Sequence, residues 1–270
     1  MTSKRLCAAT LATALACSFS PGARAAEAPP ADLPTCPTKD DAPDPALLIK
    51  RIERTLEGRS TISTMTMSIR TKAWSRRLRM KAWSKGRDYA LIRVLEGGPR
   101  ETGLLTLKRE KQLWNYLPQA GRTMKLPSGM LGDSWLGSDF TNDDLVRGNS
   151  IVDDFDTALV GRATHDGRDA WRLTLTPKPE AVVVWGRIEM LVDRAACVPL
   201  LERFYDEEGV LARTMSFSDI RSIGWRQFPA RVSIVPEETA RETAISYDEI
   251  QFDVLIPDDT FSLHRLQQGR

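Results

Sequence analysis

Hydrophobic and polar side chains alternate along most of the chain from residue 61 onward. In the stretch ISTMTMSIRT, Met65, Met67 and Ile69 fall on one face of an extended strand, and hydroxyl residues fall on the other. Similar runs follow, such as YALIRVLE, AWRLTLTP, VVVWGRIEMLVD and TAISYDEIQFD, with short turns between them. The HDGR step at residues 165–168 is a strong hairpin signal. About a dozen such strands predict an antiparallel meander.

A sheet with so many strands does not stay flat, so we expect a mainly β fold that coils into a barrel or half-barrel. Before the strands, Pro45 opens a helix with Leu48, Ile52 and Leu56 on one face, and Gly58 ends it. The other face carries the charged residues Lys50, Arg51, Glu53, Arg54 and Glu57. This amphipathic helix is a natural cover for one open side of the sheet.

The stretch WSRRLRMKAWSK combines cations with two tryptophans. Alternation places Trp74, Leu78, Met80 and Ala82 on the inner face of a strand. The outer face then carries Arg77, Arg79 and Lys81. Three interpretations are open: a solvated face, a docking patch for an acidic partner or lipid headgroups, and a nucleic-acid surface.

The first 25 residues have the pattern of a cleavable signal peptide. Lys4 and Arg5 precede an apolar run that is too short to span a bilayer, and a small-residue site predicts cleavage after Ala25. Lipid anchoring through Cys17 is an alternative, although the residues before it match a lipobox only loosely. Residues 26–45, rich in Ala, Pro and Asp, form a predicted flexible arm, and residues 46–270 a single domain.

Charge and cysteine usage agree with export. Removing residues 1–25 takes away three cations and no acid, so the formal net charge changes from +2 to −1 and gives no attraction to nucleic acid. Two cysteines, Cys36 and Cys197, then remain. An even pair in an exported chain predicts a disulfide, and two free thiols are the alternative.

The residues give no sign of catalysis. His165 falls in the predicted hairpin turn and His264 near the C-terminus, and neither has a partner pattern for a metal or a general base. The acidic run at residues 139–144 lacks the spacing of a calcium loop. Thr141 and Asp144 instead fit a helix capping box. We therefore predict no metal, no cofactor and no enzymatic activity.

The central stretch LWNYLPQAGRTMKLPSGMLGDSWLGSDFTNDDLVR, residues 113–147, closely resembles the signature of LolA-like outer-membrane lipoprotein-sorting proteins. It is most similar to a broad subfamily that is often associated with RND/MMPL-type exporters. The matching positions are Trp114, Tyr116, Pro118, Arg122, Ser134, Trp135, Gly137, Ser138, Asp139, Phe140, Asp144 and Leu145. The ending IPDDTFSL also resembles the family, so the resemblance covers roughly residues 46–266.

The resemblance implies a strongly curved antiparallel half-barrel with short lid helices and an apolar cavity for lipid or lipoprotein acyl chains. It also implies a monomeric periplasmic carrier that contacts a membrane surface transiently and works with an inner-membrane RND/MMPL-type transporter. The predicted lipid-binding and lid residues are Met65, Met67, Leu78, Met80, Trp114, Met130, Leu131, Trp135, Leu136 and Phe140. The alternative is that these side chains are ordinary core.

Two other functions are open at this point. The protein is an accessory docking subunit of an envelope exporter with no cargo of its own, or a cofactor-free enzyme that uses the same cavity. The enzyme would need a polar cluster inside the cavity, such as an inward arginine with Tyr116 or Asp139.

Overall fold

The computed structural model describes residues 28–33, 35–36, 42–147, 151–181 and 183–269. The predicted signal peptide, its cleavage site and Cys17 lie outside these residues. Within the described chain, thirteen strands form one antiparallel sheet. The strands are β1 Ser60–Arg70, β2 Ser75–Lys85, β3 Tyr89–Glu96, β4 Leu105–Arg109, β5 Gln112–Leu117, β6 Arg122–Lys125, β7 Phe155–His165, β8 Arg168–Pro177, β9 Arg187–Asp193, β10 Pro199–Tyr205, β11 Leu211–Ile223, β12 Arg226–Pro236 and β13 Glu242–Phe252.

The strand order is β6-β5-β4-β3-β2-β1-β13-β12-β11-β10-β9-β8-β7. Neighbours in the sheet are therefore neighbours in sequence, except where the first strand pairs with the last, from Thr61 opposite Phe252 to Arg70 opposite Glu242. The two edges, β6 and β7, follow one another along the chain, so the segment between them must run from one edge to the other. That segment carries the short helices η1 Ser128–Met130, η2 Trp135–Gly137, α2 Asn142–Arg147 and α3 Ile151–Asp154.

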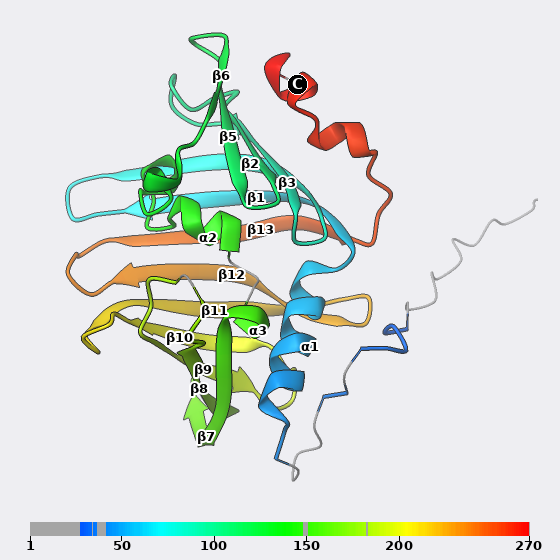
Figure 1. Ribbon diagram of the computed structural model, residues 1–270, viewed down its shortest axis with the longest axis vertical. Coiled ribbons are helices and arrows are strands. Elements are labelled where there is room, and N and C mark those ends of the chain that lie inside the picture. The colour runs from blue at the N-terminus through cyan, green and yellow to red at the C-terminus, as the bar shows by residue number, and fades with distance from the viewer. Residues whose placement is uncertain (1–27, 34, 37–41, 148–150, 182, 270) are drawn as a thin grey trace, which may run out of the picture.

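The sheet is strongly curved, and the helices α1, α2 and α3 lie on one face of it (Figure 1). β-bulges or irregularities interrupt the register at five places, including Thr64/Met65 and Arg79/Met80, and a bulge increases local bending and twist. The predicted fold is therefore confirmed: mainly β, antiparallel and curved, with an N-terminal helix and short helices over the open side.

Helix α1, Pro45–Glu57, begins and ends where the sequence predicted. The Asp44 side chain accepts a hydrogen bond from the backbone N–H of Leu47 at 3.0 Å, and Gly58 ends the helix at φ 63°. Its buried face includes Leu48 and Ile52 as expected. Glu53 and Glu57 were placed on the face opposite these residues, but Glu53 is buried and both carboxylates pair with Arg87.

Local turn chemistry also follows the sequence. At the β7–β8 hairpin, Asp166 and Gly167 have φ values of 48° and 75°, and His165 pairs with Arg168. Two consecutive positive φ angles are what a tight two-residue hairpin turn requires, and Asp-Gly supplies them at low cost. At the other end of the domain, η3 Asp258–Phe261 and α4 Leu263–Gln267 close the chain, with Phe261 only 3% exposed.

Strand β2 confirms the predicted parity. Leu78 and Met80 are fully buried, whereas Arg77 and Arg79 are exposed and Lys81 is partly exposed. Trp74 does not share the inner face, so that expectation was wrong. It lies before the strand, in a turn where the Thr71 hydroxyl accepts a hydrogen bond from its backbone N–H, and its side chain is 48% exposed.

The predicted disulfide is present between Cys36 and Cys197, whose Cα atoms are 6.0 Å apart. Cys197 is fully buried two residues before β10. A second contact fixes the same segment, because Asp32 pairs with Arg54 of α1 at 2.9 Å. The arm is thus tied both to the covering helix and to the sheet.

Candidate functional site

A cavity of about 450 Å³ lies between the sheet and the helices that cover it. This volume is within the range of small-molecule sites. Its walls come from α1, from the strands β1 to β4, β7 and β9 to β13, from the segment that joins the two sheet edges and from residues 183–185 before β9. The apolar lining includes Ile49, Ile52, Met65, Ile92, Trp185, Ile188, Met190, Phe204, Met215, Phe217, Phe228, Ile245 and Tyr247.

The structure brings three of the ten predicted lipid-binding residues to this cavity: Met65, Trp135 and Phe140. Four others, Met67, Leu78, Met80 and Leu136, belong with Trp135 to one packed cluster of the core. The remaining three lie elsewhere: Trp114 packs in a separate cluster with the C-terminal segment, Met130 is 43% exposed, and Leu131 is partly exposed. A role in lipid binding stays a prediction for all ten.

Residues 133–145, here called the signature loop, carry Trp135 into the core. The loop closes on itself through a bridge between Ser134 and Thr141 and a 2.7 Å hydrogen bond from the Trp135 N–H to the Phe140 carbonyl. The Trp135 side chain is 3% exposed, and its indole N–H donates to the Thr106 hydroxyl at 3.3 Å. A buried indole with a satisfied N–H is a firm anchor for the loop.

The acidic residue Asp139 fastens the signature loop to the sheet. Its carboxylate accepts a hydrogen bond from Thr243 of β13 at 2.6 Å and pairs with Arg241 at 2.9 Å. Two guanidinium groups, those of Arg76 and Arg241, also donate to carbonyls of the loop. An acidic loop with apolar side chains is therefore held by charge at its rim and by burial at its centre.

At the other end of the loop, Thr141 and Asp144 form the predicted capping box. The Thr141 N–H donates to Asp144 at 2.8 Å, and the Asp144 N–H donates to the Thr141 hydroxyl at 3.1 Å. The same carboxylate receives both terminal nitrogens of Arg213, at 2.8 and 2.6 Å. A bidentate pair of this kind fixes the start of α2 against β11.

Arg213 is buried, and so is Glu202 beside it on β10. The guanidinium lies over the rings of Trp185 and Phe204, at 4.7 and 4.5 Å from their centroids. Burial raises the pKa of Glu202 to about 7, although the positive charge of Arg213 acts in the opposite direction. A titratable carboxyl thus lies in the wall of a cavity that is lined mainly by apolar side chains.

A second charged group lies where α1 ends. Glu53 and Glu57 both pair with Arg87, and Glu53 also accepts the Val152 N–H of α3 at 3.2 Å. Burial raises the pKa of Glu57 to about 7, with Arg87 opposing the shift. Lys108, on β4, lines the same end of the cavity, and burial lowers its pKa. These pairs tie α1 and α3 to the sheet.

Strand alternation in the sequence contains a signal for these inward charges. Arg213 has the same strand parity as Met215 and Phe217, which line the cavity. Glu202 likewise has the same parity as Phe204. A charged residue at an inward position of an alternating strand indicates a polar feature of the interior.

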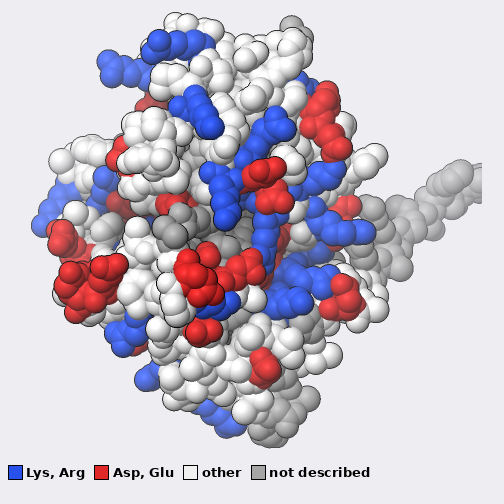
Figure 2. All heavy atoms as spheres, viewed as in Figure 1, with Lys and Arg blue, Asp and Glu red and all other residues white. Residues whose placement is uncertain are grey.

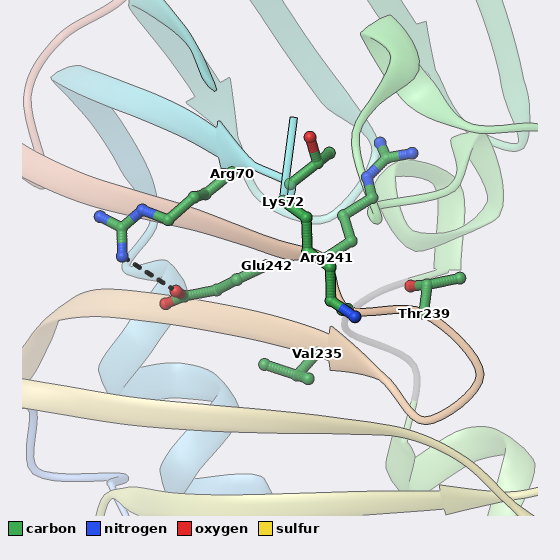
Figure 3. Close-up of a pocket in the computed structure, with 8 residues that line it drawn as sticks. Arg70, Lys72, Val235, Thr239, Arg241 and Glu242 are labelled. Carbon is green, nitrogen blue, oxygen red and sulfur yellow. Dashed lines mark ion pairs between the residues drawn. The ribbon is translucent and has the colours of Figure 1, made fainter. Parts of the chain in front are cut away.

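Charged side chains of both signs gather near the middle of the helix-covered face, over and beside α1 and α3 (Figure 2). A shallower hollow of about 280 Å³ lies apart from the cavity, where the end of β1 meets the β12–β13 hairpin (Figure 3). There Arg70 and Glu242 approach to 3.7 Å, and Arg241 turns toward the signature loop and Asp139. Of these side chains, Arg241 therefore helps to hold the loop.

In the part of the chain that the structure describes, no three or more His, Cys, Asp or Glu side chains are grouped as a metal site. None of its helices has the length and apolar character needed to cross a membrane.

A family model described as an uncharacterized protein matches residues 86–268, more than half of the chain. The chain belongs to this family. No curated protein matches it.

Several solved structures share the fold of this chain. A DUF1329 family protein from Desulfovibrio piger superposes with a TM-score of 0.75 at 23% identity, covering 82% of this chain and 97% of its own. A putative outer membrane lipoprotein-sorting protein domain from Vibrio parahaemolyticus gives 0.70 at 19% identity, covering 83% and 98%. A LolA superfamily protein from Nitrosomonas europaea gives 0.69 at 19% identity, covering 83% and 100%. The resemblance to LolA-like proteins is confirmed at the level of the fold, which this chain shares with these structures.

Proposed function

We propose that this protein is a periplasmic carrier that binds lipid or lipoprotein acyl chains in the cavity between its sheet and helices. The single observation that supports this most is the cavity itself, about 450 Å³ and walled largely by apolar side chains of α1 and the sheet. Such a concave apolar site with a few polar groups is the usual form of a small-molecule or lipid site. The disulfide fits an oxidising compartment outside the cytoplasm.

The proposed function is not catalytic. The inward arginine that an enzyme would need is present as Arg213, but its two terminal nitrogens are both bound to Asp144, which also caps α2. The pair therefore holds the covering segment in place. From the family resemblance we also propose that the carrier is monomeric, touches a membrane surface transiently and receives or delivers cargo at an RND/MMPL-type transporter.

The experiment is to fill the cavity. Met215 lines it from β11, so Met215→Trp should exclude a neutral apolar fluorescent probe such as N-phenyl-1-naphthylamine and weaken its binding at least about tenfold. Met124→Trp is the matched control, because Met124 is 40% exposed on β6 and does not line the cavity. Circular dichroism checks that both variants are folded.

Native mass spectrometry of protein purified from its own envelope supplies the second readout. We expect lipid to co-purify with the wild-type protein and the Met124 variant, and to be lost from the Met215 variant. Equal probe binding by all three proteins would show that the probe binds at a site other than this cavity. A wild-type protein without lipid and without probe binding would favour a docking subunit that carries no cargo.

A further inference from the structure

The polar part of the cavity wall is acidic in balance. Six carboxyl groups line the cavity in the described part of the chain: Glu53, Glu57, Asp143, Asp144, Asp154 and Glu202. Three cations face them: Arg87, Lys108 and Arg213. The described lining of the cavity thus contains more acidic than basic side chains.

The two arginines already have partners. Arg87 pairs with Glu53 and Glu57, and Arg213 pairs with Asp144 through both terminal nitrogens. Lys108 does not reverse the balance, because the negative charges of Glu57 and Asp88 both act on it. Neither arginine is therefore free for an incoming anion.

Glu202 differs from the other carboxyl groups. It lines the cavity and is 7% exposed, and it forms no hydrogen bond or salt bridge with a described residue, although the positive charge of Arg213 acts on it. Strand alternation directs it to the same side as the cavity-lining Phe204, while its neighbour Arg203 is exposed. A buried carboxyl without a donor is costly, and a ligand that brings the donor removes that cost.

We propose that the ligand is an amphiphile whose polar end donates hydrogen bonds, as an ammonium or a hydroxyl does, and that Glu202 accepts from it while the chain lies against the apolar wall. An anionic end is disfavoured at Glu202, because it would add a negative charge beside Glu202 and Asp144 and offers no hydrogen to donate. The inference rests on the proposed function and defines its substrate class. It excludes free fatty acids as preferred cargo.

The test compares three ligands with the same tail. Dodecylamine, dodecanol and dodecanoate, each below its micelle concentration, compete with N-phenyl-1-naphthylamine for the delipidated protein. We expect the amine to bind at least about tenfold more tightly than the carboxylate, with the alcohol between them. Glu202→Gln should remove most of the preference for the amine over the carboxylate. Glu189→Gln is the matched control, since Glu189 lies on the adjacent strand β9, outside the cavity lining, and should keep it.

The outcomes are distinct. Dodecanoate binding as tightly as the amine in the wild-type protein overturns the inference, and this ranking needs no variant to fold. An amine preference that survives in folded Glu202→Gln overturns the assignment to Glu202. If the neutral probe binds, either of these two results leaves the carrier function standing. If neither the probe nor any of the three ligands binds, both the inference and the carrier function are overturned.

Discussion

The disulfide is the feature whose energetic weight follows most directly from the structure. It joins Cys36 to Cys197 across 161 residues, so it closes a loop that contains most of the sheet. In the chain-entropy description, a cross-link over a loop of that length lowers the entropy of the unfolded chain enough to stabilise the folded state by about 5 kcal/mol at 25 °C. Since domains of this size are stable by roughly 5–15 kcal/mol, the bond is a major share of the total.

Denaturant unfolding followed by tryptophan fluorescence tests this value. Oxidised wild-type protein, reduced wild-type protein and Cys36→Ser are compared, and the variant serves as the control because a reductant should leave its midpoint unchanged. Cys36 is the residue to replace, since Cys197 is fully buried and adopts a positive φ of 52°. We expect the reduced protein and the variant to unfold together, several kcal/mol below the oxidised form. Unfolding of all three at one midpoint would refute the loop-closure reasoning.

Three further predictions concern single side chains. Reversing the charges of Arg77 and Arg79 should change stability by no more than about 0.5 kcal/mol in thermal melts, whereas Leu78→Ala should cost about 2–5 kcal/mol; a large loss from charge reversal would contradict the parity of β2. Trp135→Ala should cost about 3–5 kcal/mol, because the side chain is 3% exposed, and a melt close to wild type would show that the loop is only loosely docked. Burial raises the pKa of Glu202 from 4.5 to about 7, so the unfolded chain ionises this carboxyl first and the wild-type protein loses stability as pH rises from about 4.5 to 7. Glu202→Gln does not titrate, so its stability relative to wild type should rise across that window by up to about 3 kcal/mol, and a difference that does not vary with pH would contradict the assignment.

Local features of the fold could be predicted from the sequence because they depend on local physics. The period-two pattern predicted the inner face of β2, the Asp166-Gly167 step predicted a hairpin turn, and Pro45 and Gly58 predicted the two ends of α1. Each depends on a few adjacent residues whose backbone or side-chain preferences are strong. The Thr141–Asp144 capping box is of the same kind.

The polar interior could not be predicted in this way, because its partners are distant in sequence. Glu53 looks like a solvent-facing helix residue until Arg87 is brought against it, and Asp144 meets Arg213 only after the chain has crossed the open side of the sheet. A charged residue is therefore assigned to the surface by default, and only three-dimensional pairing identifies the exceptions. Trp74 shows the opposite error. The alternation of β2 was extended to a residue before the strand begins, and this placed an exposed side chain on the inner face.

The pairing of β1 with β13 at the centre of the sheet has a consequence for how the molecule assembles. β1 is synthesised first but can pair with β13 only after β13, the last strand, has been made. Until then each half of the sheet has an exposed edge strand that can pair with other chains. Pairing over such a separation gives a high contact order and therefore slow folding. β13 also supplies Ile245, Tyr247 and Ile250 to the cavity wall, so the cavity is completed only when the sheet is. Truncation of β13 would therefore remove the central pairing of the sheet and part of the cavity wall together.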